Sequence, residues 1–124
     1  MNKKILVVED EVSLRNVLVE KLKSEDFDVI EARNGEEGLE ISISQKPNLI
    51  LLDIIMPKMD GLTMLEKLRE DSWGKKVPVV ILTNLSSGME MSKSAENGVS
   101  SYLVKTDWKL EDVVKKVKEI LKLA

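Results

Sequence analysis

Four short apolar runs in this chain of 124 residues each end at a different polar residue. Each run has the length and the apolar composition of a buried strand. If these strands are parallel, the residues that follow them lie at the carboxyl edge of one sheet, where open α/β sheets bind their ligands. The runs are residues 5–8, followed by Glu9 and Asp10; 49–52, followed by Asp53; 79–82, followed by Thr83; and 102–104, followed by Lys105.

The segments between the runs have the spacing of amphipathic helices, with apolar residues recurring every three or four positions. This spacing predicts that one face of each helix packs on the sheet. In the first and last helices the predicted buried residues are Val12, Leu14, Val17, Leu18 and Leu22, and Leu110, Val113, Val114, Val117, Ile120 and Leu121.

Polar residues at the predicted helix starts have the chemistry of N-caps. A weaker strand at residues 29–30 precedes Asn34, which is predicted to cap a helix that runs to about Ser44. Glu37 stands three residues after Asn34, as in a capping box. Asp60 is the predicted cap of the next helix.

Strands that alternate with helices predict an α/β fold of five βα units. We expect a five-stranded parallel sheet between two layers of helices, connected by right-handed crossovers. The chain is long enough for one hydrophobic core and too short for two ordinary domains. Residues 1–124 are therefore expected to form a single domain.

Composition excludes several classes of function. With 19 basic and 22 acidic residues, the net charge of −3 gives no basic surface for nucleic acid or an anionic membrane, so neither is an expected direct partner. The absence of cysteine and histidine rules out disulfides, thiolate or imidazole ligands, and a phosphohistidine on this chain. The N-terminal apolar run is too short for a signal peptide or a membrane span. We expect a soluble, cytoplasmic protein.

The polar endings indicate phosphoryl chemistry that depends on a metal. Three carboxylates in one pocket, from Glu9, Asp10 and Asp53, repel one another, and a hard divalent cation such as Mg²⁺ relieves that repulsion. Lys105 and Thr83 offer a charge and a hydroxyl donor to phosphate oxygens bound at the same place. Because a carboxylate can act as a nucleophile, the simplest scheme is in-line attack by Asp53 to give an aspartyl phosphate.

Each of these residues also has an ordinary structural interpretation. Glu9 and Asp10 are suited to the positive end of the following helix, and Asp53 to an Asx turn. Thr83 has the composition of a turn residue, and a lone lysine such as Lys105 indicates little. The coincidence of all four strand endings favours a site over these separate explanations.

The motifs at residues 5–11, 49–61, 82–83 and 102–105 resemble those of bacterial response-regulator receiver domains, the family of the chemotaxis response regulator. The resemblance extends over essentially the whole chain. It implies a flavodoxin-like (βα)5 fold with strand order 2-1-3-4-5, and Mg²⁺ or Mn²⁺ as the cofactor. The partners it implies are a sensor histidine kinase or phosphotransfer protein, and a downstream effector protein or domain. The chain would be a phosphoacceptor regulator rather than an enzyme, acting alone or as part of a longer protein.

The resemblance also implies a role for individual residues of the metal site. Asp53 would be the phosphoacceptor and a metal ligand, and Asp10 a second direct ligand. Glu9 would bind the metal through water, and the backbone carbonyl of Ile55 would complete the protein ligands.

The remaining implied roles belong to a conformational switch. Lys105 and Thr83 would hold the phosphoryl oxygens, with Thr83 moving toward the phosphoryl group as the aromatic Tyr102 turns inward. These movements would reshape the face around the fourth helix, the fifth strand and the fifth helix. Residues 86–98 are rich in Ser and Gly and poor in apolar residues, which predicts a weak and movable helix there.

Several residues depart from the family pattern. Thr106 stands where a proline usually follows the lysine, and Asn84 replaces a smaller residue after the threonine. Glu9 replaces the commoner aspartate but keeps the charge. Ile55 and Leu85, which flank the phosphoryl group in this family, cannot orient a water molecule. We therefore predict slow self-hydrolysis of the phosphoaspartate.

Three other functions compete with this interpretation. A phosphohydrolase with an aspartate nucleophile would have a second acid at the position of Ile55. A flavodoxin-like electron carrier would need a phosphate cradle where Glu9, Asp10 and Glu11 repel anions. A receiver-like domain that switches through partner binding alone is compatible with Asn84 and Thr106.

Overall fold

The computed structural model describes residues 3–53, 59–83, 101–104 and 109–122. Its five strands form one parallel sheet in the order β2-β1-β3-β4-β5, which confirms the predicted parallel α/β fold and the order implied by the resemblance. The strands are β1 (Lys4–Val8), β2 (Asp28–Ala32), β3 (Leu49–Asp53), β4 (Val79–Thr83) and β5 (Ser101–Val104). The helices are α1 (Val12–Ser24), α2 (Gly35–Gln45), α3 (Gly61–Glu70) and α5 (Leu110–Ile120). The predicted weak helix at residues 86–98 lies outside the described residues.

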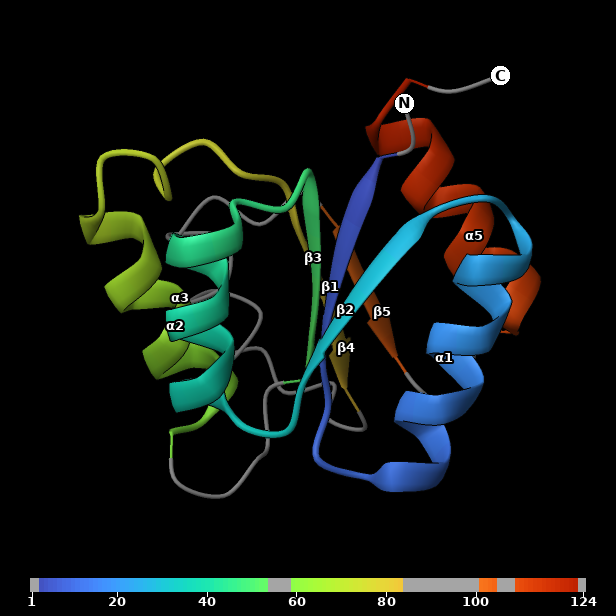
Figure 1. Ribbon diagram of the computed structural model, residues 1–124, viewed down its shortest axis with the longest axis horizontal. Helices are drawn as coiled ribbons and strands as arrows, with labels where there is room; N and C mark the ends of the chain where they lie inside the picture. The colour runs from blue at the N-terminus through green and yellow to red at the C-terminus, as the bar shows by residue number, and fades with distance from the viewer. Residues whose placement is uncertain (1–2, 54–58, 84–100, 105–108, 123–124) are drawn as a thin grey trace.

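The helices form two layers, one on each face of the sheet. Helices α1 and α5 cover one face, and α2 and α3 cover the other (Figure 1). Along β1, Ile5 and Val7 belong to the core beneath α1 and α5, whereas Leu6 and Val8 belong to the core beneath α2 and α3. This alternation follows from the two-residue period of a strand and explains why residues 5–8 of β1 and 49–52 of β3 are apolar at every position.

The predicted buried face of α1 is wrong at two positions. Val12 and Val17 are 58% and 43% exposed, and Leu14 is only partly buried. The buried residues of this helix are Arg15, Leu18, Val19 and Leu22. These four lie three or four residues apart along one face and form a single stripe. The sequence prediction contained Leu18 and Leu22 but neither Val19 nor the charged Arg15. The predicted apolar face of α5 is confirmed, with Val113, Val114 and Val117 buried.

The two predicted helix caps are confirmed. The side-chain oxygen of Asn34 accepts a hydrogen bond of 2.8 Å from the N–H of Glu37, and Asp60 accepts one of 2.8 Å from the N–H of Thr63. The capping box at α2 differs from the prediction by one residue, because the Glu37 carboxylate accepts from the N–H of Arg33 rather than of Asn34.

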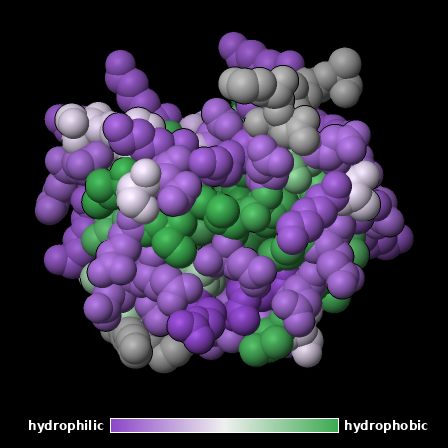
Figure 2. All heavy atoms as spheres, in the orientation of Figure 1, coloured by the Kyte–Doolittle hydropathy of each residue, from purple (hydrophilic) through white to green (hydrophobic). Residues whose placement is uncertain are grey.

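Strand β2 forms an edge of the sheet and is the least buried of the strands whose burial the structure describes. Val29 and Ile30 at its centre are half-buried, and hydrophobic residues show in the middle of this face of the molecule (Figure 2). Asp28 and Glu31 on the same strand are exposed, and charged side chains on an edge strand oppose pairing with another chain. No helix in the described ranges is long and apolar enough to cross a membrane.

Candidate functional site

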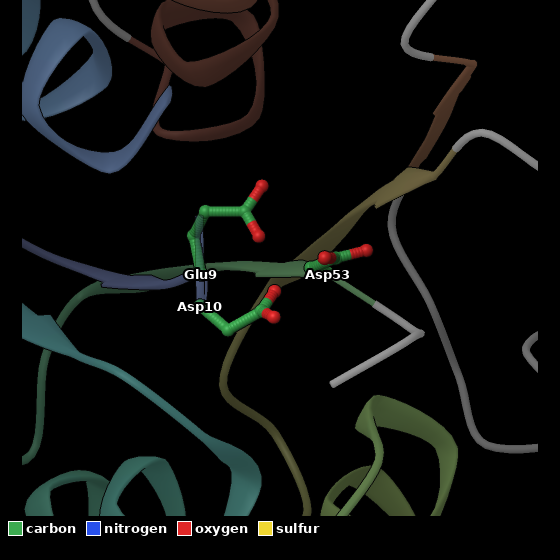
Figure 3. A group of neighbouring side chains, drawn as sticks. All are labelled: Glu9, Asp10 and Asp53. Atoms are coloured by element: carbon green, nitrogen blue, oxygen red, sulfur yellow. The ribbon is translucent and has the colours of Figure 1, made fainter. Parts of the chain in front are cut away.

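Three acidic residues meet where β1 and β3 end. Glu9 and Asp10 directly follow β1, and Asp53 is the last residue of β3. Because β1 and β3 are neighbours with Val8 paired to Leu52, the acidic residues lie side by side at the carboxyl edge of the sheet (Figure 3). One carboxylate oxygen from each residue lies within 4.8 Å of the others.

The acidic cluster brings three carboxylates together in a partly buried place. Glu9 is 1% exposed and Asp53 is 6% exposed, while Asp10 is exposed to solvent. Like charges held this close repel one another. A cation bound between the three oxygens would offset that repulsion, so the electrostatics favour a metal ligand set.

The donor set fits a small hard cation. Two oxygens on opposite sides of Mg²⁺ are about 4.2 Å apart, twice a metal–oxygen bond of about 2.1 Å. The 4.8 Å span of the cluster is close to that separation and leaves room for one ligand to bind through water. Asp10 is exposed to solvent, which suits a site that takes up a hydrated ion. All three side chains offer oxygen donors, which Mg²⁺ and Mn²⁺ accept and softer metals do not prefer.

The backbone of Glu9 is fixed by its neighbours in the fold. Its N–H donates to the carbonyl of Ala32 in β2 at 3.0 Å, and its carbonyl accepts from Nη1 of Arg15 at 2.9 Å. Nε of Arg15 in turn donates to the carboxylate of Glu31 at 3.1 Å. Sequence reasoning missed this contact, although Arg15 stands three residues before Leu18, on the apolar stripe of the helix.

The other predicted site residues are described only in part. Thr83 ends β4 beside the end of β3, where Asp53 is paired with Leu82, so its backbone lies at the same edge as the acidic cluster. Tyr102 lies in β5, paired with Ile81. Outside the described residues lie Ile55, Asn84, Leu85, Lys105 and Thr106.

Comparison with known proteins identifies the family. The family model of the response regulator receiver domain matches residues 5–118. The chain belongs to this family. As a receiver domain it is a phosphoacceptor regulator of two-component signalling and not a classical enzyme, which decides against the phosphohydrolase and the electron carrier.

Related sequences include larger regulators. The receiver domain is 37% identical over 122 residues to the alkaline phosphatase synthesis transcriptional regulatory protein PhoP of Bacillus subtilis, covering 98% of this chain and 50% of the relative. It is 42% identical over 102 residues to the probable transcriptional regulator ycf27 of Porphyridium aerugineum, covering 82% of this chain and 41% of the relative. The chain thus spans about half the length, or less, of these curated relatives.

Solved structures agree with the fold. A CheY-like response regulator receiver domain protein from Methanospirillum hungatei superposes with a TM-score of 0.92 at 28% identity, covering 98% of this chain and 95% of that one. The CheX–CheY–BeF3–Mg2+ complex from Borrelia burgdorferi gives a TM-score of 0.87 at 27% identity, and the match covers 96% of this chain and 89% of that one. Receiver domains with this fold therefore include one solved with Mg²⁺ and BeF3.

Proposed function

We propose that this receiver domain is a phosphorylation-dependent switch in which Asp53 accepts a phosphoryl group from the phosphohistidine of a sensor kinase or phosphotransfer protein. The convergence of Glu9, Asp10 and Asp53 at the carboxyl edge of the sheet carries the proposal. Membership of the receiver family supports it, since such domains act as phosphoacceptors in two-component systems.

The proposed reaction is an in-line displacement at phosphorus. A carboxylate oxygen of Asp53 attacks the phosphorus atom and forms a new P–O bond while the P–N bond to the donor imidazole breaks. The imidazole keeps the electron pair of the broken bond and takes up a proton. The position of Asp53 at the end of β3, held by a buried strand, would orient the attacking oxygen.

Asp53 and Asp10 are the proposed direct metal ligands, Glu9 a ligand through water, and the Ile55 carbonyl a further ligand. A bound Mg²⁺, or Mn²⁺, would supply positive charge to the phosphoryl oxygens. The cluster's all-oxygen donor set and the BeF3–Mg complex of the Borrelia burgdorferi CheY support this assignment.

The proposed switch begins with Lys105 and Thr83, which would hold the phosphoryl oxygens. Movement of Thr83 and rotation of Tyr102 would then change the face around β5 and α5 that a downstream effector recognises. The effector is either a separate protein or another domain, and the names of the relatives, which are transcriptional regulators, support control of transcription as the output. We place this function in a single domain, residues 1–124, acting in the cytoplasm without direct contact to nucleic acid or membrane.

Phosphorylation by a small donor tests the proposal directly. The protein and an Asp53→Asn variant are incubated with acetyl phosphate and Mg²⁺, and their intact masses are measured. The expected result is a gain of one phosphoryl group in the unmutated protein alone, abolished by removing Mg²⁺. A gain in the Asp53→Asn variant would contradict the assignment of the phosphoacceptor.

Beryllofluoride provides an independent measurement. It is added with Mg²⁺ to both proteins, and the tryptophan fluorescence is followed. A change in the unmutated protein alone is expected. No mass gain and no fluorescence change would favour a receiver that switches through partner binding alone, and would make Asn84 and Thr106 the residues to revert.

A further inference from the structure

Arg15 is a buried cation that reaches from α1 to the backbone of the acidic cluster. Its side chain is 10% exposed, and it donates to the Glu9 carbonyl at 2.9 Å and to the Glu31 carboxylate at 3.1 Å. Burying a guanidinium is costly unless its donors are bound, and these two contacts occupy two of its five N–H groups. The arginine therefore has one defined position between α1, β2 and the end of β1.

The contact to the Glu9 carbonyl fixes more than one residue. The carbonyl of Glu9 and the N–H of Asp10 belong to the same planar peptide, so a hydrogen bond at one end sets the orientation of the other. This peptide joins two of the three residues in the acidic cluster. Its orientation determines the direction in which both side chains leave the backbone.

Glu31 completes the arrangement from the edge strand. Its carboxylate is 45% exposed and binds Nε, leaving Nη1 directed at the carbonyl. The planar guanidinium makes these two directions dependent on each other, because its donors form a rigid fork. A lysine at this position has one nitrogen and cannot reproduce both contacts with the same geometry.

We propose that Arg15 is a positioning residue for the acidic cluster, which holds the Glu9–Asp10 peptide in the orientation that binds a divalent cation. The inference rests on the proposed function, because it assumes that the cluster binds Mg²⁺. Residues that orient metal ligands typically contribute 10-fold to 100-fold to metal affinity. Arg15 acts through the backbone of Glu9 and not by contact with the reacting atoms.

The charge of Arg15 and its contact with the Glu9 carbonyl should have opposite effects on Mg²⁺ affinity, so the positioning role can be tested. Replacing Arg15 with Met removes a positive charge near the site, and by Coulomb's law alone that change would strengthen Mg²⁺ binding. Loss of the positioning contact would weaken it. The sign of the change in the dissociation constant therefore distinguishes the two effects.

The experiment measures Mg²⁺ affinity by titrating the backbone amide signals of the protein with MgCl2. We expect Arg15→Met to raise the Kd about 10-fold and Arg15→Lys to give an intermediate value. In the metal-free protein, the carbonyl carbon resonance of Glu9 should shift in Arg15→Met because a hydrogen bond to that carbonyl is lost. This second readout needs no metal and no phosphorylation.

Val19→Ala is the matched control, since Val19 is buried one turn later in α1 and its truncation destabilises the same helix. Its Kd should stay within twofold of the unmutated protein. An unchanged or lower Kd in Arg15→Met, or an equal rise in Val19→Ala, would overturn the inference alone. If the unmutated protein binds no Mg²⁺, or if Asp10→Asn binds it equally well, the proposed metal site fails together with the inference.

Discussion

Lys118 in α5 donates a hydrogen bond of 2.8 Å to the carboxylate of Glu25, the residue that follows α1. The pair joins the first helix of the chain to the last. The hydrogen bond and charge of Lys118, with a smaller contribution from Lys21, hold the pKa of Glu25 below its ordinary value. Lys21 approaches the same carboxylate at 3.8 Å.

The stabilisation by Glu25 should depend on pH. A carboxyl whose pKa is lower in the folded state stabilises the fold above its unfolded pKa of about 4.3, and this stabilisation is lost as the pH falls through the folded value. We expect Glu25→Gln to be less stable than the unmutated protein at pH 7. The gap between their free energies of unfolding should narrow below about pH 4. Urea unfolding across this range measures the gap.

Glu20→Gln is the control for that experiment. Glu20 is exposed on α1 and makes no ion pair with any residue that the structure describes. Its replacement should leave the pH dependence unchanged. A gap that stays constant from pH 7 to pH 3 in Glu25→Gln would show that Lys118 does not act through the charge of Glu25.

Gly35 should tolerate a methyl group less well than Gly38 in the same helix. A Cβ at Gly35 would lie 2.1 Å from the carbonyl oxygen of Met59, which already accepts a hydrogen bond of 3.0 Å from the Gly35 N–H. At Gly38 the nearest atoms belong to the side chains of Met64 and Val8, at 3.0 Å. We expect Gly35→Ala to lower the free energy of unfolding by about 1–3 kcal/mol, because backbone must move.

Gly38→Ala serves as the comparison. Its side-chain contacts can adjust, and alanine favours a helix over glycine by about 1 kcal/mol, so the net change should be close to zero. Chemical unfolding measures the change in the free energy of unfolding for both variants. Equal losses of stability at the two positions would contradict the prediction, because the Met59 backbone would then move as easily as a methionine side chain.

The strands and caps were predictable because their signals are local. The apolar runs bounded by polar residues located the strands, and the single side chains of Asn34 and Asp60 located two helix starts. The face of α1 was not predictable to the same degree. Its buried Arg15 depends on acceptors at Glu9 and Glu31, which only the folded chain brings within reach.

The acidic cluster was predictable in membership but not in geometry. Parallel strands place Glu9, Asp10 and Asp53 at one edge whatever the details of packing. Their separation and the burial of two of them depend on the register of β1 against β3 and on the contacts of α1. The roles assigned to Thr83 and Tyr102 concern a change between two states and stay predictions.

The cap of α3 should contribute to stability through one hydrogen bond. The Asp60 carboxylate accepts from the N–H of Thr63 at 2.8 Å, a donor that the helix itself cannot satisfy. We expect Asp60→Ala to lower the free energy of unfolding by about 1 kcal/mol, and Asp60→Asn to change it by much less because asparagine caps equally well. Chemical unfolding of both variants measures this difference; equal losses would rule out the cap as the cause.

The phosphoaspartate should hydrolyse slowly. Hydrolysis needs a water oriented for attack, and the side chains that flank the phosphoryl group in this family are here Ile55 and Leu85, which have no polar group to hold one. We expect a lifetime of minutes or longer with Mg²⁺ present, and a shorter one in Ile55→Asn. The loss of phosphoryl mass with time measures both, and a lifetime of seconds in the unmutated protein would contradict the prediction.

Removing one charge from the acidic cluster should stabilise the fold in the absence of metal and make it less stable than the unmutated protein when Mg²⁺ is bound. The three carboxylate oxygens lie within 4.8 Å of one another, and two unit charges at this distance repel by about 1 kcal/mol even in water. Without metal, Asp10→Asn should therefore be more stable than the unmutated protein, by about 1 kcal/mol for each of the two repulsions that it removes, with Glu9 and with Asp53. At a Mg²⁺ concentration of about 100 times Kd, binding should stabilise the unmutated protein by about 2.7 kcal/mol and make it the more stable of the two proteins.

Asp28→Asn, at an exposed carboxylate outside the cluster, should keep the full stabilisation by Mg²⁺. Urea unfolding with EDTA or MgCl2 measures all three proteins, and an equal Mg²⁺ response in Asp10→Asn would exclude Asp10 as a ligand.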